Sequence, residues 1–506
     1  MTLKSFIALA ATLAGSALSA ATPPDPTPRP NILWFVVDDM SPNFSCYGET
    51  AIQTPNVDQL AKEGTRFRHA FITAPVCSPS RSAMITGMYQ TTIGSHHHRS
   101  GRGSLRIQLP TGVSPLPDLF KKAGYHTCIG SGLIGLDHTG SPLREGRSPL
   151  GKTDYNFDWK TPLYDDADWS FRKPDQPFFM QVQLHGGKLR EGGPNAARNL
   201  NQRAEKLLGS ALNPNQFVLP PYYPRESLIL SDWHAYLDAV RLTDHHVGTV
   251  LKRLENEGLK KNTLVIFMTD HGISHARGKQ FLYNEGTHIP FIVAGPNIPA
   301  NAERSDLIEH IDMAALSLAA AQIPIPETMQ GKDVFAPSYQ PRPHVFAARD
   351  RCDETVERLR SVRSQQFLYI RNFYPKRPLL QPNAYKDGKP ILQRLKELHA
   401  KGELSELQDH LLFAPERPPE ELYDWIRDPW QTQNLAASPE HKNTLSSLRK
   451  TLDDWMRDTR DHGPETEAAY DSDMAVYLGR KNHANDTPSP VRDNIQLMKR
   501  WAADGR

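Results

Sequence analysis

The segment from Asn31 to Met40 reads NILWFVVDDM, and it is the strongest indication of the fold class. Its first part, Asn31 to Val37, is almost wholly apolar and stops at two adjacent acids, Asp38 and Asp39. A short apolar run without alternation is typical of a strand that is buried on both faces of a sheet. We therefore predict a central strand over residues 31–37 whose carboxyl end carries two carboxylates.

Three further apolar runs have the same character. They are PFFMQVQL at 177–184, which ends at His185; TLVIFM at 263–268, which is followed by Thr269, Asp270 and His271; and PFIVA at 290–294. Helical periodicity separates them, most clearly over 231–257, where Gly258 is a stop signal. The alternation predicts an α/β domain over residues 29–340, with a central, mostly parallel or mixed sheet flanked by helices.

The pattern changes after a proline-rich stretch at 337–343. Short strand-like segments such as HVFAARD and RSVRSQQFLYIRN follow, together with a charged helical region. We predict a smaller α+β subdomain with an antiparallel sheet over residues 344–506.

The N-terminus and the net charge indicate where the protein is located and which partners it binds. Residues 1–20 combine Lys4, a short apolar stretch and small residues, which predicts a secretory signal peptide and an exported protein, periplasmic or extracellular. No later apolar segment is long enough for a membrane span, so no membrane association is expected. The 506 residues carry a net charge of +2, which gives no indication of a nucleic-acid partner.

Four polar side chains follow two of the predicted strands directly: Asp38, Asp39, Asp270 and His271. Ligands of α/β proteins bind at the carboxyl ends of the strands, and carboxylates that converge there repel one another unless a cation lies between them. Oxygen-rich ligands favour Ca²⁺, or Mg²⁺ where the cage is tight. The alternative is that each acid caps a following helix.

The pentapeptide Cys77-Ser78-Pro79-Ser80-Arg81 opens a segment of small residues that reads as a helix. Proline suits the first turn of a helix, so Cys77 is predicted at the helix mouth, where free N–H groups favour an anion. Arg81 can return over the same mouth and bind tetrahedral oxyanions. The alternative is an ordinary helix start with a buried thiol and a surface arginine.

Four stretches together resemble the formylglycine-dependent sulfatases of the alkaline-phosphatase superfamily: RPNILWFVVDDM, VCSPSRSAMITGMY, NTLVIFMTDHG and EELYDWIRDPWQTQNLA. The resemblance implies an alkaline-phosphatase-like large domain and calcium bound by Asp38, Asp39, Asp270, His271 and residue 77. It also implies that a formylglycine-generating or anaerobic sulfatase-maturing enzyme oxidises Cys77. The hydrated aldehyde would attack sulfur through one hydroxyl, and the second would expel sulfate.

The sequence departs from the family pattern at two places. After Gly124-Tyr125-His126-Thr127 the usual Gly-Lys-Trp-His is absent, and we expect Lys152 to supply the lost lysine, with Asp154 in the place of the histidine. The alternative for Lys152 is an ordinary lysine in a solvated loop. The usual His-x-Pro-His reads His185-Gly186-Gly187-Lys188, so His185 and Lys188 are candidates for the acid or for a sulfate contact, or are ordinary wall residues.

Three further sites follow from the same resemblance. Lys279 matches the family lysine that contacts both the formylglycine and the sulfate. Within His96-His97-His98-Arg99, we expect His96 or His97 to contact the substrate and the other histidines to be exposed. Arg349 is a substrate-binding candidate whose alternative is a solvated strand end.

The sequence thus predicts a secreted hydrolase of sulfate esters on oligosaccharides derived from sulfated polysaccharides. A sulfated carbohydrate and the maturation enzyme are its expected partners. Two alternatives stay open: a phosphonate or phosphodiester hydrolase of the same superfamily, and a non-catalytic protein that binds sulfated glycans.

Overall fold

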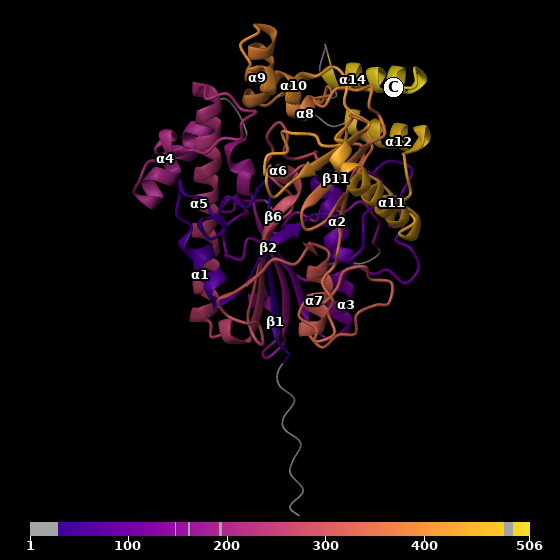
Figure 1. Ribbon diagram of the computed structural model, residues 1–506. Coiled ribbons are helices and arrows are strands. Elements are labelled where there is room, and N and C mark those ends of the chain that lie inside the picture. The colour runs from indigo at the N-terminus through magenta and orange to yellow at the C-terminus, as the bar shows by residue number, and fades with distance from the viewer. Residues whose placement is uncertain (1–28, 147, 160–161, 192–194, 480–488) are drawn as a thin grey trace, which may run out of the picture.

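The computed structural model describes residues 29–146, 148–159, 162–191, 195–479 and 489–506 (Figure 1). The predicted signal peptide, residues 1–20, lies outside these ranges. The predicted fold class is confirmed, because a large mixed sheet carries helices on both faces and a separate antiparallel sheet follows it.

The main sheet has the strand order β3-β4-β1-β5-β6-β2-β7, with β8 also paired to β2. Its strands are β1 (Asn31–Val37), β2 (Gly64–Phe71), β3 (His126–Gly130), β4 (Phe178–Leu184), β5 (Thr263–Thr269), β6 (His288–Ala294), β7 (Ala302–Arg304) and β8 (Ile308–Glu309). Strands β3, β4, β1 and β5 are parallel, and β6 runs antiparallel to β5. The four apolar runs in the sequence are therefore β1, β4, β5 and β6.

Helices cover both faces of this sheet. Helices α1 (Pro55–Glu63), α4 (Ala196–Leu208) and α5 (Ser227–Asn256) lie on one side, and α2 (Cys77–Thr86), α3 (Leu116–Lys122) and α7 (Asp312–Ala320) lie on the other (Figure 1). Alternate residues of β1 serve the two cores: Leu33 and Phe35 pack with residues of α5, whereas Trp34 and Val36 pack with residues of α3 and α7. A strand buried on both faces needs apolar residues at every position, which explains the unbroken run.

The second sheet is antiparallel, in the order β12-β11-β10-β9. Its strands are β9 (Val345–Arg349), β10 (Leu359–Arg363), β11 (Phe367–Asn372) and β12 (Glu420–Asp424). The helices α6 (Asn284–Thr287), α8 (Ala384–Asp387), α9 (Pro390–Ala400), α10 (Glu406–Phe413), α11 (Lys442–Asp458), α12 (Glu467–Leu478) and α14 (Pro490–Ala503) complete the described chain. The domain limits at 340 and 344 stay a prediction.

In Figure 1, α8, α9, α10 and α14 lie at the top of the molecule, above one end of the main sheet, and β11 and α11 lie beside α6 and α2. The C-terminal elements pack there through apolar side chains, for example Phe71 and Phe281 of the large part against Val345 and Leu368 of the second sheet. In the described chain no helix is both long and apolar enough to cross a membrane. The four cysteines are free thiols.

Candidate active site

Three parallel strands end at the same level, and their ends form the base of the site. In the sheet register, Val37 of β1 is paired with Leu184 of β4 and with Thr269 of β5. The next residues along the three strands, Asp38, His185 and Asp270, are therefore delivered to one edge. The predicted convergence of two strand ends is seen in the structure.

A close backbone approach brings Lys188 to this edge. Gly187 N–H donates to the carbonyl oxygen of Asp38 at 2.9 Å. A Cβ atom at Gly186 would lie 2.2 Å from the Asp38 carbonyl oxygen, and one at Gly187 would lie 2.2 Å from that of Asp39. Since only glycine permits such an approach, the pair lets the turn over Gly186–Arg190 lie against Asp38 and Asp39 and aim Lys188 at them.

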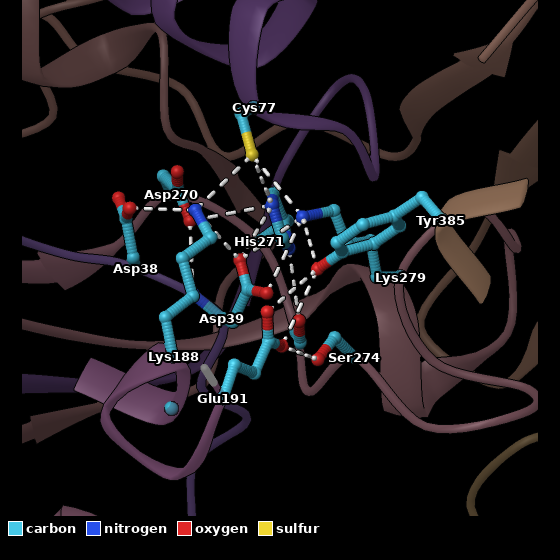
Figure 2. Close-up of polar contacts among 12 residues, drawn as sticks. Asp38, Asp39, Cys77, Lys188, Glu191, Asp270, His271, Ser274, Lys279 and Tyr385 are labelled. Atoms are coloured by element: carbon cyan, nitrogen blue, oxygen red, sulfur yellow. Dashed lines mark hydrogen bonds and ion pairs between the residues drawn. The ribbon is translucent and has the colours of Figure 1, made fainter. Parts of the chain in front are cut away.

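Cys77 is the first residue of α2, and its thiol faces a group of cations. Figure 2 shows the sulfur atom above Lys188, His271 and Lys279. The distances from Sγ are 3.2 Å to His271 Nε2, 3.3 Å to Lys279 Nζ and 3.5 Å to Lys188 Nζ. Burial opposes ionisation, but Lys152 and these neighbours hold the pKa of the Cys77 thiol well below its usual range. The mouth of α2 is thus built to hold negative charge.

The carboxylates are fully buried and share the same cations. Lys188 Nζ lies 2.6 Å from Asp38 and 3.2 Å from Asp39, and Lys279 Nζ lies 3.3 Å from Asp39. Burial alone would raise the pKa of Asp38 and of Asp39, but the neighbouring cations hold both well below the usual range.

Arg81 has a different set of partners from the one expected. Its guanidinium is paired with Asp38, lies 3.2 Å from Asp270, and donates to Gln183 Oε1 at 2.5 Å. It is 1% exposed and does not line the cavity at Cys77. Because a guanidinium this deeply buried needs carboxylate partners, Arg81 orients the acids of the site.

The donor set fits a hard divalent cation. One ligand atom each of Asp39, Cys77 and His271 lie within 4.8 Å of one another. Burial raises the pKa of Asp270 to about 6, because the nearby cations His271 and Arg81 lower it by less than burial and the neighbouring Asp38 raise it. His271 donates from Nδ1 to the Gly272 carbonyl at 2.9 Å, which leaves Nε2 facing Cys77 and Asp39. Buried carboxylates with one imidazole suit Ca²⁺ or Mg²⁺.

A cavity of about 400 Å³ opens above these groups. The side chains that line it include Cys77, Lys152, Lys188 and Lys279. Lys152 Nζ lies 2.8 Å from Asp154, which also accepts from Arg102 at 2.6 Å. The structure thus brings the lysine expected after the insertion to the same cavity as Cys77. Ser131, which a direct alignment without an insertion would put in place of the family lysine, donates instead to the carbonyl oxygens of Leu133 and Leu136 within its own loop.

The far side of the cavity carries a second polar group. Tyr385 Oη lies 3.5 Å from Lys279 Nζ and 3.3 Å from each carboxylate oxygen of Glu191. Glu191 also accepts from Ser274 and is paired with Lys389 (Figure 2). These contacts hold Lys279 from the side opposite Asp39.

Four predicted site residues lie elsewhere. His185 lines a neighbouring cavity, with its ring 4.9 Å from that of His138. His96 is buried and its Nε2 bonds to the Gly463 carbonyl, and neither His96 nor His97 lines the cavity at Cys77. Arg349 is 2% exposed and donates to Gln280 at 3.2 Å. The expectation of exposed histidines at 96–98 is wrong, because the C-terminal part of the chain covers this loop.

Several residues that line the cavity were not predicted from the sequence: His98, Arg99, Glu191, Asp353, Ala384, Tyr385 and Tyr477. His98 belongs to the histidine run, but nothing in the run distinguishes one histidine from the next. Asp353 follows the charged stretch Arg349-Asp350-Arg351. The two tyrosines give no local signal, since their role depends on α8 and α12 packing over the cavity.

The comparisons with known proteins agree with this geometry. A family model described as Sulfatase matches residues 30–323, and a second, described as N-sulphoglucosamine sulphohydrolase, C-terminal, matches residues 271–377. An ulvan-active sulfatase of Formosa agariphila is 33% identical over 87% of this chain and 77% of its own. Human N-sulphoglucosamine sulphohydrolase is 27% identical, over 85% of this chain and 90% of its own.

Solved structures share the fold. BT4656, solved in complex with its substrate D-glucosamine-2-N,6-O-disulfate, has a TM-score of 0.57 and 19% identity, over 87% of this chain and 100% of its own. A phosphonate monoester hydrolase of Silicibacter pomeroyi also has a TM-score of 0.57, at 16% identity, over 86% of this chain and 96% of its own. The fold therefore serves more than one ester class, and the sequence relatives decide between them. On the family match and the 33% identity, the chain belongs to the sulfatases, enzymes that hydrolyse sulfuric esters.

Proposed function

We propose that the protein is an exported, formylglycine-dependent sulfatase that removes sulfate from the end of oligosaccharides derived from sulfated polysaccharides. The observation that carries the proposal is the placement of Cys77 at the bottom of a cavity with three lysines around it. Lys152, Lys188 and Lys279 are well placed to bind the three non-bridging oxygens of a sulfate ester.

The acids below the thiol would bind a metal ion. Asp38, Asp39, Asp270 and His271 would hold Ca²⁺, or Mg²⁺, with residue 77 completing the set. The bound ion would neutralise the buried carboxylates and favour the ionised nucleophile. Formylglycine at residue 77 would supply, as its hydrate, a hydroxyl that attacks sulfur. Arg81 keeps Asp38 and Asp270 in place, and Tyr385 with Glu191 orients Lys279.

The substrate class follows from the cavity and from the relatives. A cavity of about 400 Å³ walled by α8 and α12 suits a terminal sugar better than the middle of a chain. The relatives are named for ulvan and for N-sulphoglucosamine, both sulfated carbohydrates. The predicted signal peptide at residues 1–20 supports a location outside the cytoplasm, where such polymers are met.

The deciding experiment is the mass of the tryptic peptide 69–81, from protein made in a host that converts a control sulfatase. We expect the mass of an aldehyde or its hydrate at residue 77. The same protein is then assayed for inorganic sulfate released from defined sulfated mono- and oligosaccharides, with a phosphonate monoester and a phosphodiester in parallel.

Each outcome separates one alternative. An aldehyde with sulfate release supports the proposal. An aldehyde with faster turnover of the phosphonate or the phosphodiester would replace it with the related hydrolase. An unmodified thiol beside a fully converted control, together with glycan binding and no release, would identify a binding protein.

A further inference from the structure

One histidine, His98, faces the nucleophile, and the proposed function gives it no role. Among the described residues that line the cavity at Cys77, His98 is the only histidine. One of its ring nitrogens lies within 4.8 Å of both Cys77 Sγ and a carboxylate oxygen of Asp154. Its Nε2 is buried and has no hydrogen-bond partner. Burial without a partner is costly for a polar atom, and it marks a position where a substrate can supply the partner.

Asp353 lies on the other side of the ring. The Nδ1 atom of His98 is 3.1 Å from an Asp353 carboxylate oxygen and 3.7 Å from Cys352 Sγ. Asp353 has a φ of 51°, a left-handed conformation that is uncommon outside glycine. A two-way backbone bridge between Cys352 and Thr355 fixes this turn. An acid held behind a histidine in this way fixes the orientation of the ring.

The backbone of His98 is fixed as well. His98 N–H donates to the Arg351 carbonyl at 2.8 Å, and Arg351 Nη1 donates to the His98 carbonyl at 3.0 Å. Arg351 is itself paired with Glu465 at 2.6 Å and with Asp473 at 2.7 Å. The loop after α2 is therefore locked to the C-terminal part of the chain, with His98 at the junction.

Of the two acid candidates expected from the sequence, Lys188 lines the cavity at Cys77 and His185 does not. His185 lines the neighbouring cavity, and Lys188 and Lys279 are held by carboxylates and aimed at Cys77. A general acid must come within hydrogen-bond reach of the leaving oxygen, on the substrate side of the nucleophile. His98 lines the cavity, and one of its ring nitrogens lies within 4.8 Å of Cys77 Sγ, the atom at the position of the proposed nucleophile.

We propose that His98, oriented by Asp353, is the acid that protonates the leaving group of the substrate. This inference rests on the proposed sulfatase function and deepens it. The bond between sulfur and the bridging oxygen breaks, and its electron pair stays on that oxygen. The oxygen takes the proton of His98 Nε2 while sulfur binds the nucleophile at residue 77. The ring regains a proton from solvent once the alcohol has left.

The charge state of the ring agrees with this role. Burial would lower the pKa of His98, but the Asp353 carboxylate and Cys352 raise it to about 10. The carboxylate of Asp353, 3.1 Å from Nδ1, thus favours the protonated ring, which is the form that an acid requires.

The test compares leaving groups of different acidity. His98→Gln, Asp353→Asn and the control His246→Gln are measured on a series of sulfate esters from 4-nitrophenyl sulfate to phenyl sulfate and a sugar sulfate. His246 is also buried and bonds to one backbone carbonyl, that of Ser131, but it lies on α5 outside this cavity. A general acid matters most when the leaving alcohol is a weak acid.

For His98→Gln we expect kcat/KM to fall by roughly 10²–10⁴-fold on the sugar and phenyl esters, and by less than about tenfold on 4-nitrophenyl sulfate. Asp353→Asn should give the same trend with smaller losses, and it carries the test if His98→Gln does not fold. His246→Gln should follow the wild type. An equal loss on every ester, or no loss on the sugar ester, would overturn the role of His98 alone. A wild type that carries the aldehyde and releases no sulfate from any ester would overturn the proposed function and this role together.

Discussion

The floor and the wall of the cavity are built in different ways. The floor consists of Asp38, Asp39, Cys77, Asp270 and His271, which lie at the ends of adjacent strands and at the start of α2. The wall consists of His98, Asp353, Tyr385 and Tyr477, which lie on segments spread over most of the chain. A sheet edge fixes the floor, whereas the wall depends on the C-terminal part docking correctly.

The difference suggests a division of labour. The floor contains the charges needed for any sulfate ester, so a change there should affect all substrates alike. The wall faces the part of the substrate that leaves, so a change there should depend on the substrate. Changes to the proposed nucleophile, the proposed metal, the proposed sulfate-binding lysine and a buried acid test this division, in order of decreasing expected effect.

Cys77→Ala removes the proposed nucleophile from the floor and should lower sulfate release by about 10⁵-fold or more on every ester. Ion chromatography of released sulfate measures the loss, and the thermal midpoint checks the fold. A residual rate that differs strongly between esters would break the comparison, because the floor would then select substrates.

Treatment with a chelator tests the proposed divalent ion of the floor without a mutation. Dialysis against a chelator should lower the rate by roughly 10⁴-fold, because metal ions supply several kcal/mol of charge stabilisation. The thermal midpoint should also fall, since buried carboxylates would lose their cation. Added Ca²⁺ or Mg²⁺ should restore both readouts, and the ion that restores more at equal concentration is the native one. An unchanged midpoint and rate would contradict a metal site.

Lys152→Ala tests a residue that lies between floor and wall. Loss of one charged contact to the sulfate should lower kcat/KM by roughly 10³-fold on all esters. Lys173→Ala, at an exposed lysine, is the matched control and should leave the rate unchanged. A near-normal rate for Lys152→Ala would show that this lysine is an ordinary loop residue.

Glu354→Gln tests the stability of the wall, and here the expected effect is smallest. Burial and the neighbouring Asp353 raise the pKa of Glu354 from its ordinary value of 4.5 to about 7. The folded protein therefore holds this proton more tightly than the unfolded chain, so stability falls as pH rises from about 4.5 to about 7. The loss is about 3 kcal/mol, given 1.36 kcal/mol for each pKa unit between 4.5 and 7.

The variant keeps the shape of the side chain without its charge. Glu354→Gln should therefore be more stable than the wild type at pH 8, and its denaturation midpoint should change less between pH 5 and pH 8. Glu403→Gln, at an exposed position, should keep the wild-type pH dependence. Parallel curves for the wild type and Glu354→Gln would contradict a buried, strained acid behind the wall.

Much of the fold was predictable because local patterns encode it. The unbroken apolar runs gave β1, β4, β5 and β6, and the long periodic segment gave α5, which the structure extends to Ser227–Asn256. The departure from the family's His-x-Pro-His pattern has a structural consequence, because Gly186 and Gly187 allow the close turn that presents Lys188. We expected Lys152 to take the place of the lost family lysine because of an insertion, and the structure is consistent with this, since Lys152 lines the cavity at Cys77.

The misplacements share one physical cause. His185 follows β4 as expected, but its ring faces His138 and the neighbouring cavity. His98, not His96 or His97, faces the site, because Arg351 holds that loop over a separation of 253 residues. No periodicity or spacing reports a contact over such a distance.

The acids of the floor are encoded locally. They follow apolar runs, and parallel strands deliver the residues at their carboxyl ends to a common edge, so the order of residues was enough to place them. The wall depends on tertiary packing, because the positions of His98, Asp353, Tyr385 and Tyr477 depend on how α8, α12 and the second sheet pack against the main sheet. That packing is set by many buried contacts between distant segments, and no single stretch of the chain contains it.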